Sequence, residues 1–502
     1  MLRHNPYLLL LGLFFLGAGP VAAQTYYIAP TGNDSNNGTS QSTPWATLSK
    51  VNGFAFVPGD QVLFQRGGTW TGRLVITHAG TSGSPITYGA YGSGNLPMIS
   101  GNNHSINDLI GVEANNIVID SLRSSYSSVY GAKTSGRSNV TFKNCEVDHS
   151  NHGGIIFENC SNITVDNCKV HHTNSLGSSA WHEAISLMNV NTFEVKNNEV
   201  YSCQEEGIDA KYGSHNGRIH HNHSHGNHSA NIYVDGASDI QVYDNLSHDT
   251  TAGDKACIGI AVEPNSGNHQ TFSVRVYNNV VYGCGAGICM WPYESWARLE
   301  NVRIEHNTIV DNSATNNWGG ILVVGGTVNY GTGNMIRNNI IMNNNGAAIK
   351  DGFGDNLGVA ALFTIDRNLF KTGEASHPFG TNAFKTTADP FVNWPGKDFH
   401  LTSTSPARGI GQAIPDITTD IEGTPRASDS IDVGAYQFSS SSGSACDLNH
   451  DGSTNVMDVQ GMVNQAIGVA ACTADLNRDG LCNVIDVQRV VNAAQGGPCV
   501  SL

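Results

Sequence analysis

The sequence predicts an all-β protein, a right-handed, single-stranded parallel β-helix solenoid, followed by a small α-helical calcium-binding domain. Two observations carry this prediction. From about residue 139 to 340 a short motif recurs, in which a β-forming residue is followed by Asn or Cys and then by more β-formers. Near the C-terminus a calcium-loop pattern occurs twice, 28 residues apart (475 − 447).

The recurring motif fixes the architecture of the body. Its last residues are spaced by 23 to 34 positions (168 − 145 and 279 − 245), with Asn/Gly turns and no helical stretch between them. Such a period indicates stacked coils. Asn at one coil position is suited to an internal ladder of amide hydrogen bonds, in which Cys is an apolar substitute. The predicted row is Cys145, Cys168, Asn198, Asn222, Asn245, Asn279, Asn307 and Asn339.

The first residues predict export. Arg3 and His4 precede the apolar run Tyr7–Leu16, and Val21-Ala22-Ala23 is a small-residue cleavage pattern, so residues 1–23 are expected to be a signal peptide. No later stretch is apolar for long enough to span a bilayer. The net charge of −16 argues against nucleic-acid binding. We therefore expect a secreted, extracellular protein, with attachment to a cell surface or scaffold left open.

The body has recognisable ends. Residues 26–60 resemble the entry cap of secreted bacterial β-helix proteins, and residues 399–407 and 431–436 resemble their closing coils. We expect a β-helix domain with an N-terminal cap over residues 24–438, its coils continuous from about residue 50 to 436. Residues 439–444 are a Ser/Gly linker, and residues 445–502 form the calcium-binding domain.

The two C-terminal loops carry oxygen ligands at positions 1, 3, 5, 9 and 12 and Gly at position 6, the pattern that wraps a chain around Ca²⁺. The ligands are Asp447, Asn449, Asp451, Asn455 and Asp458, then Asp475, Asn477, Asp479, Asn483 and Asp486. The duplication resembles a type I dockerin, which attaches extracellular enzymes to cohesin-bearing scaffolds. The resemblance implies a cohesin partner; the alternative is a calcium-stabilised tail without one. Dockerins often have Ser-Thr at positions 10 and 11, where this chain has Val456-Met457 and Val484-Ile485.

Only 14% of the residues are charged, yet several are expected to gather on neighbouring coils. Residues one and three places after an inward Ile point outward, because side chains alternate along a strand. The coils are aligned here on Ile155, Ile185, Ile208, Ile232, Ile260 and Ile288. The alignment groups Glu183, Glu206, Asp209, Lys211, Tyr233, Asp235 and Glu263, with Trp291 in the same outward column as Lys211.

Carboxylates beside a lysine are suited to β-elimination on a uronic-acid polymer, in which Ca²⁺ neutralises the sugar carboxylate and a base removes the neighbouring proton. The segments 182–187, 205–211 and 232–235 resemble β-helix polysaccharide lyases of the alginate lyase and chondroitinase B type. A Glu five residues before a Lys is the spacing of those enzymes, so the resemblance implies Lys211 as base and Glu206 as a calcium ligand.

The remaining expected roles complete this site. The lyases use an Arg of the next coil, which is absent near residues 229–235, so His228 or Tyr233 is the candidate in its place. Calcium would be held by Glu206 with Glu183 or Asp209. The substrate-binding candidates are Asp235, Glu263 and Trp291.

Other interpretations remain open. A glycoside hydrolase could use two carboxylates from Glu183, Glu206, Asp209 and Asp235. A non-catalytic polysaccharide-binding protein needs neither chemistry, and Lys211 would then form a surface ion pair with Asp235 and Asp209, worth less than about 1 kcal/mol per pair.

Aromatic, histidine and cysteine residues leave further choices. Trp291, Tyr293 and Trp296 could stack on sugar rings or cover the sheet. The histidines between residues 220 and 228 fit a polar loop better than a metal cluster, because alternate residues face opposite sides. The seven cysteines of the body are expected to be small buried core residues, whereas disulfides are plausible among Cys446, Cys472, Cys482 and Cys499.

Overall fold

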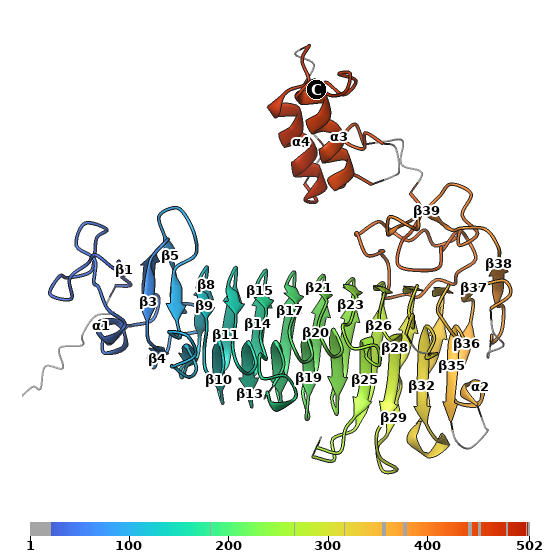
Figure 1. Ribbon diagram of the computed structural model, residues 1–502, viewed down its shortest axis with the longest axis horizontal. Helices are drawn as coiled ribbons and strands as arrows, with labels where there is room; N and C mark the ends of the chain where they lie inside the picture. The colour runs from blue at the N-terminus through green and yellow to red at the C-terminus, as the bar shows by residue number, and fades with distance from the viewer. Residues whose placement is uncertain are drawn as a thin grey trace, which may run out of the picture.

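The computed structural model describes residues 22–180, 182–265, 267–315, 317–353, 358–374, 379–439, 444–449, 453–477, 480–497 and 499. Its body is a parallel β-helix, in which successive coils add strands to three long sheets (Figure 1). The predicted all-β solenoid is therefore confirmed. The expected signal peptide, apart from residues 22 and 23, and residues 440–443 of the expected linker lie outside the described residues.

Sheet 1 is parallel throughout. Its strands are β1 (Thr25–Ile28), β2 (Gln61–Gln65), β5 (Ile86–Tyr91), β8 (Ile117–Asp120), β11 (Ser138–Lys143), β14 (Ser161–Asp166), β17 (Asn191–Lys196), β20 (His215–His220), β23 (Ser238–Tyr243), β26 (Thr271–Tyr277), β29 (Leu299–Glu300), β30 (Arg303–Glu305), β33 (Met335–Arg337) and β36 (Thr364–Asp366).

Sheet 2 follows sheet 1 across a short turn in most coils. Its strands are β3 (Thr69–Thr71), β6 (Met98–Ser100), β9 (Arg123–Ser125), β12 (Glu146–Asp148), β15 (Lys169–His171), β18 (Glu199–Tyr201), β21 (His223–His225), β24 (Leu246–His248), β27 (Val280–Tyr282), β31 (Thr308–Val310), β34 (Ile340–Met342), β37 (Leu369–Lys371) and β38 (Phe384–Thr386).

Sheet 3 carries most of the predicted site. Its strands are β4 (Leu74–Ile76), β7 (Ile110–Val112), β10 (Ala132–Ser135), β13 (Ile155–Glu158), β16 (Ile185–Met188), β19 (Ile208–Lys211), β22 (Ile232–Asp235), β25 (Ala256–Val262), β28 (Ala286–Pro292), β32 (Ile321–Gly325) and β35 (Ile349–Phe353). The inward Ile and Val side chains of the three sheets form one continuous core.

The predicted asparagine ladder lies between sheets 1 and 2. The Nδ2 of Asn222 donates to Asn245 Oδ1 at 3.0 Å, and Asn245 Nδ2 donates to Asn279 Oδ1 at 2.9 Å. The row continues in the same way through Asn307 and Asn339 to Asn368. Cys168 takes its expected place, since its backbone N–H donates to Asn198 Oδ1 at 2.8 Å. These buried amides satisfy one another, which is the condition for polar side chains inside a core.

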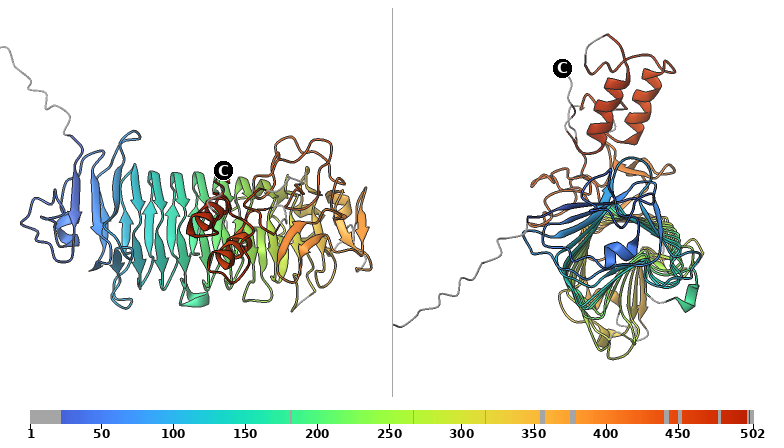
Figure 2. Two further views of the ribbon diagram at one scale, coloured as in Figure 1. Left: turned by 90° about the horizontal axis from the view of Figure 1, so that it is seen from above. Right: turned by 90° about the vertical axis from the view of Figure 1, so that its left-hand side faces the viewer.

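Both ends of the solenoid are covered. At the N-terminal end, α1 (Leu48–Asn52) lies across the first coils (Figure 2, right), and Tyr26 stacks on the buried Trp45 at 5.0 Å. Near the other end lie the short helix α2 (Val359–Leu362) and the antiparallel pair β39 (Phe391–Asn393) and β40 (Asp398–Leu401). Two 3₁₀ turns, Gly177–Ser179 and Thr327–Asn329, occur in loops between coils.

The prediction that residues 399–407 and 431–436 form closing coils is wrong. Stacked coils end at β38, and the following chain turns back along sheet 2. Phe399, Val433 and Ala435 pack on the outward-facing Val280 and Val310. The buried Arg426 guanidinium donates to Asn278 Oδ1 at 2.8 Å. The segment thus covers an apolar outer face that would otherwise be exposed.

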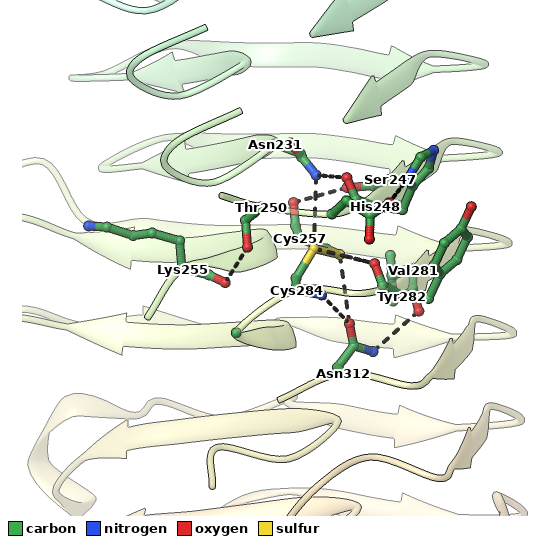
Figure 3. The surroundings of a disulfide bond; sticks show 12 residues. Asn231, Ser247, His248, Thr250, Lys255, Cys257, Val281, Tyr282, Cys284 and Asn312 are labelled. Carbon is green, nitrogen blue, oxygen red and sulfur yellow. Dashed lines mark hydrogen bonds and ion pairs between the residues drawn. A yellow bond between two sulfur atoms is a disulfide. The ribbon is translucent and has the colours of Figure 1, made fainter. Parts of the chain in front are cut away.

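Two body cysteines also differ from expectation. Cys257 of β25 and Cys284 after β27 form a disulfide with a Cα–Cα distance of 5.4 Å (Figure 3). Neighbouring coils bring together residues that are 27 positions apart, a proximity that spacing alone does not reveal. The other five, Cys145, Cys160, Cys168, Cys203 and Cys289, are buried thiols as expected.

The C-terminal domain contains two helices, α3 (Val456–Ala466) and α4 (Val484–Ala494), which pack against each other. Disulfides join Cys446 to Cys499 and Cys472 to Cys482, the four cysteines for which pairing was plausible. None of the helices in the described part of the chain has the length and apolarity that a membrane crossing requires.

Candidate functional site

The strand register of sheet 3 corrects one column of the predicted site. Ile232 of β22 pairs with Ile258, and Ile258 pairs with Ile288, so the inward residue of β25 aligned with them is Ile258 and not Ile260. The residue beside Asp235 is therefore Ala261. Glu263 lies two positions farther along the chain, where its backbone N–H donates to Asp235 Oδ1 at 2.8 Å. The column holding Lys211 and Trp291 is otherwise as predicted.

Lys211 lies inside the carboxylate cluster as an ion-paired side chain. Its ammonium contacts the Glu183 carboxylate and lies 3.5 Å from Asp209 Oδ2. Glu183 Oε2 also accepts a hydrogen bond from Ser186 Oγ at 2.6 Å. Lys211 is 8% exposed and Glu183 6% exposed, so this is a buried pair. Of the two surface ion pairs considered from the sequence, the one with Asp209 is present but buried, and the one with Asp235 is not among the described ion pairs of Lys211.

The cluster shifts the proton affinities of its members. Burial alone lowers the pKa of Lys211, but the Glu183 and Asp209 carboxylates outweigh burial and raise the pKa above its ordinary value. Burial raises the pKa of Asp235 to about 7; the hydrogen bond from Glu263 N opposes this shift, and the Glu263 carboxylate adds to it. Burial likewise raises the pKa of Asp209 well above its usual range, although Lys211 opposes the shift. Lys211 is thus charged in this arrangement, and a general base must be neutral.

The calcium expected at this cluster stays a prediction. Oδ1 of Asp209 is buried and has no hydrogen-bond partner in the described part of the chain, which leaves one oxygen available to a cation. The Lys211 ammonium, however, already lies against Glu183 and Asp209. In the described part of the chain, two groups of three His, Cys, Asp or Glu residues place their ligand atoms within 4.8 Å of one another. Neither group includes Glu183, Glu206 or Asp209. An ion shared by the three carboxylates would therefore require the Lys211 ammonium to move away from Glu183 and Asp209.

A pocket of about 270 Å³ opens beside the cluster, on the later coils of sheet 3. Its acidic residues are Glu206, Asp254 and Glu263, and Lys255 supplies a cation. Four aromatic side chains also line it: Tyr233, Trp291, Tyr293 and Trp318. Trp291 and Tyr293 stack at 5.2 Å with an interplanar angle of 19°, and Trp318 meets Trp291 at 66°. The pocket therefore combines apolar ring surface with carboxylates.

Two carboxylates of the pocket are held by hydroxyl groups. Ser229 Oγ donates to Glu206 Oε1 at 2.5 Å, and Tyr233 OH donates to Glu263 Oε1 at 2.9 Å. The Tyr233 ring lies against Gly259, where a Cβ atom would come within 2.5 Å of the ring. Burial, with Glu183 next, raises the pKa of Glu206. Glu206 consequently holds its proton to a higher pH than an ordinary glutamate.

Some predicted residues are not brought into this pocket, and others were missed. His228 is exposed and contacts Thr251 Oγ1 at 3.4 Å, outside the pocket lining. Trp296 is 40% exposed and lies outside the lining as well. Trp318, Asp254, Lys255 and Ser229 were not predicted. Trp318 comes from the long connection between β31 and β32. A tryptophan in a lengthened coil was the sequence feature that could have identified it as a pocket residue.

The two predicted calcium loops of the C-terminal domain have the same local structure. Asp458 Oδ1 accepts hydrogen bonds from the backbone N–H groups of Leu448 and Asn449, and Asp486 Oδ1 accepts from those of Leu476 and Asn477. The loop asparagines cap the two helices: Asn455 caps α3 and Asn483 caps α4. Asp447 is buried, and Asp475 Oδ2 accepts from Gly480 N at 2.7 Å. The position-5 ligands Asp451 and Asp479 lie outside the described residues.

Comparisons with known proteins agree with the fold. The family described as "right handed beta helix region" matches residues 89–247 and 130–309. A lacto-N-biosidase of Bifidobacterium longum subsp. longum is 39% identical over 85 residues, which are 16% of this chain and 5% of that protein. The chain thus spans only a small part of this curated relative.

Two solved structures are similar over most of both chains. Pectate lyase Pel9A has a TM-score of 0.51 and 15% identity, covering 84% of this chain and 98% of that one. XylC, solved in complex with xylose, has a TM-score of 0.50 and 10% identity, covering 82% and 98%. At these identities the similarity concerns the β-helix fold.

Proposed function

We propose that this protein is a carbohydrate-active enzyme that binds a polysaccharide at the pocket of sheet 3 and cleaves it by carboxylate acid–base catalysis. The proposal rests on the pocket lining. It combines the aromatic side chains of Trp291, Tyr293 and Trp318 with the carboxylates of Glu206 and Glu263. Pyranose rings present apolar C–H faces and polar edges, so aromatic side chains and carboxylates are complementary to them.

Glu206 and Glu263 are suited to the two roles that glycoside hydrolysis requires. Because the pKa of Glu206 is raised, this residue keeps its proton to a higher pH than an ordinary glutamate, which suits a general acid for the leaving oxygen. Glu263, held by the Tyr233 hydroxyl, supplies the second carboxylate, which acts either as nucleophile or as base for water. Trp291 and Tyr293 would hold one sugar ring and so orient the glycosidic bond that joins it to the next ring.

The second candidate is calcium-assisted β-elimination on a uronic-acid polymer, with Lys211 as base. It is favoured by the carboxylates around Lys211 and by the spacing of Glu206 and Lys211, and a relative in fold is named a pectate lyase. A calcium ion, when bound, would neutralise the sugar carboxylate. Lys211 would have to leave Glu183 and lose its proton before it could accept one from the sugar.

We further propose that the enzyme acts outside the cell and is attached to a cohesin-bearing scaffold through the C-terminal domain. Three disulfides support an oxidising compartment, two of them within that domain. The duplicated loops and their matching helix caps support calcium binding by the same domain.

The products of a polymer screen distinguish the candidates. Alginate, pectate, chondroitin-like, heparin-like and neutral polymers are incubated with the protein, with and without calcium. A hydrolase produces reducing ends alone, a lyase produces unsaturated ends that absorb in the near ultraviolet, and a binding protein produces neither.

Variants then test the proposed acid on the best polymer. Glu206→Gln should lower kcat by about two to four orders of magnitude, because the proton donor is lost. Glu205→Gln is the matched control, because Glu205 is next to Glu206 in the sequence but does not line the pocket. This variant should retain activity within a few-fold of wild type. Wild-type activity in Glu206→Gln, or unsaturated products whose formation requires Lys211, would reject the hydrolase assignment.

A further inference from the structure

Three histidines come together on sheet 2, on a different sheet from the carbohydrate pocket. His223 and His225 belong to β21, and His248 belongs to β24 of the next coil. One ring nitrogen from each lies within 4.8 Å of the other two. The alternation that separates neighbouring residues on a strand places positions 223 and 225 on the same face. The interpretation of this segment as a polar loop therefore does not describe these two residues.

The coil register creates the cluster. His225 pairs directly with His248 in the parallel ladder, and their rings lie 5.0 Å apart at an angle of 10°. His223 and His225 lie side by side on one strand, with ring centroids 4.2 Å apart. His223 Nε2 is 2.8 Å from His248 Nε2. Three imidazoles from two coils thus direct nitrogen atoms at a common point.

Aromatic neighbours hold two of the rings in place. Tyr201, one coil before, stacks on His225 at 5.3 Å and 7°. Tyr282, one coil after, stacks on His248 at 4.7 Å and 4° (Figure 3). A stacked ring keeps its plane, so the ligand nitrogens are oriented before any ion arrives. Such preorganisation reduces the entropy lost on binding.

The protonation pattern leaves a lone pair directed inward. His248 Nδ1 donates to Asp249 Oδ2 at 2.8 Å, so Nε2 of the neutral ring is the acceptor. A carboxylate on the far nitrogen is the usual orienting partner of a metal-binding histidine. Nε2 of His225 is buried without a hydrogen-bond partner in the described part of the chain. Glu199 Oε1 lies 3.7 Å from that atom, and Glu199 Oε2 pairs with Lys169 Nζ at 3.0 Å, which leaves Oε1 as the oxygen that faces the histidines.

A second group of possible ligands shows what distinguishes this one. Glu146, Asp148 and His171 also place ligand atoms within 4.8 Å of one another. There, Arg123 Nε donates to Asp148 Oδ2 at 2.7 Å, and it lies 3.4 Å from Glu146. An arginine cation already contacts two members of that group, whereas among the described ion pairs of the three histidines the partners are Glu199 and Asp249, and the nearby Lys169 pairs with Glu199 and not with a histidine.

We propose that His223, His225 and His248 form a binding site for a divalent transition-metal ion, with Zn²⁺ as the best match. Imidazole nitrogens bind Zn²⁺ at about 2.0–2.1 Å, and a tetrahedral site then separates its ligand nitrogens by about 3.3 Å. In the structure His223 Nε2 lies 2.8 Å from His248 Nε2, and the three ligand nitrogens lie within 4.8 Å of one another, so metal binding requires the rings to adjust toward that spacing. The proton between His223 and His248 is released as the metal takes its place, and Glu199 or water supplies a fourth ligand.

A zinc titration of the untagged mature protein at pH 7.5 tests the site, since histidine is mostly neutral there. Calcium is kept in excess so that the C-terminal loops are not available to zinc. Calorimetry should find one tight Zn²⁺ site per chain, and saturating Zn²⁺ should raise the midpoint of thermal unfolding. His223→Ala, His225→Ala and His248→Ala should each weaken zinc binding at least tenfold. The control His78→Ala changes a half-buried histidine on another part of the body and should bind zinc as the wild type does.

A milder variant tests the site without removing a ligand. The Asp249 side chain is 62% exposed, so Asp249→Asn should leave the fold intact and weaken zinc binding about 10- to 100-fold by releasing His248. Co²⁺ in place of Zn²⁺ should give the visible absorption of a nitrogen-rich tetrahedral site, which disappears in His248→Ala. Absence of zinc binding by the folded wild-type protein, or equal affinity in wild type and His248→Ala, would overturn the proposal.

Discussion

The ammonium of Lys211 on β19 is paired with the carboxylate of Glu183, which precedes β16 on the adjacent coil, and both side chains are buried. The pair places a fixed positive charge beside Asp209 at the centre of the acidic cluster. A buried charge pair gains little stability over an apolar pair, but removal of one partner leaves the other charge without compensation.

Lys211→Ala should therefore lower the free energy of unfolding by about 3–5 kcal/mol, as judged by chemical denaturation. Lys143→Ala, which breaks the half-exposed pair with Asp120, should cost no more than about 1 kcal/mol. The double variant Lys211→Met/Glu183→Gln removes both charges of the pair and should recover most of the lost unfolding free energy. If Lys211→Ala costs no more than Lys143→Ala, the pair does not have the burial described here.

Asp235 should make the protein less stable as the pH rises. Its folded-state pKa is raised to about 7, above the ordinary value near 3.9, so between these pH values the folded protein binds a proton that the unfolded chain has released. The free energy of unfolding falls over that interval. Asp235→Asn, which keeps the acceptor for Glu263 N, should be more stable than wild type at pH 8 and about equal at pH 4.

The exposed Asp239→Asn is the control for this measurement, since it should show no such pH-dependent gain. Denaturation at a series of pH values provides the comparison. A constant difference between Asp235→Asn and wild type from pH 4 to 8 would contradict the assignment.

The asparagine ladder should be costly to interrupt in the middle. Asn245→Ala removes a side chain that donates to Ile219 O and Asn279 Oδ1 and accepts from Asn222, so buried partners lose their hydrogen bonds. We expect a loss of about 2–4 kcal/mol of unfolding free energy, from one to two unsatisfied buried groups. Asn245→Cys should cost less, because Cys145 and Cys168 occupy the same row.

Asn162 belongs to an exposed ladder on the outside of sheet 1, where Nδ2 donates to Asn139 Oδ1. Asn162→Gly suits its left-handed backbone (φ 53°) and should cost less than about 1 kcal/mol. Equal losses for Asn245→Ala and Asn162→Gly would show that burial of the inner ladder does not matter.

Calcium should bind at both C-terminal loops. Two equivalents are expected in a calorimetric titration of chelator-treated protein, and removal of calcium should reduce the helical circular dichroism of α3 and α4. Asp458→Asn should abolish binding at one loop and leave the other, and Asp486→Asn should do the reverse. Unchanged calcium stoichiometry in either variant would exclude that loop as a site.

Local patterns in the sequence determined the coils. The row from Cys145 to Asn339 identified the period, and the same row is the inner ladder of the structure, because an amide at a fixed coil position lies within hydrogen-bond reach of its equivalents above and below. Alternation along strands likewise placed Lys211 in the column that ends at Trp291.

Relationships between coils were decided only by the tertiary structure. Coil lengths vary, so a register shift of two residues on β25 placed Ile258 where Ile260 was expected and moved Glu263 out of its column. Cys257 with Cys284, His248 with His223, and Trp318 in the pocket depend on the same stacking.

The charge state of Lys211 was also decided by the tertiary structure. Sequence spacing indicated a lysine among carboxylates, but its contact with Glu183 and its burial are set by the packing of adjacent coils. A strand's own sequence fixes which side chains share a face. The lengths of the intervening turns fix which coils bring those faces together, and turn geometry is not encoded in the alternating pattern.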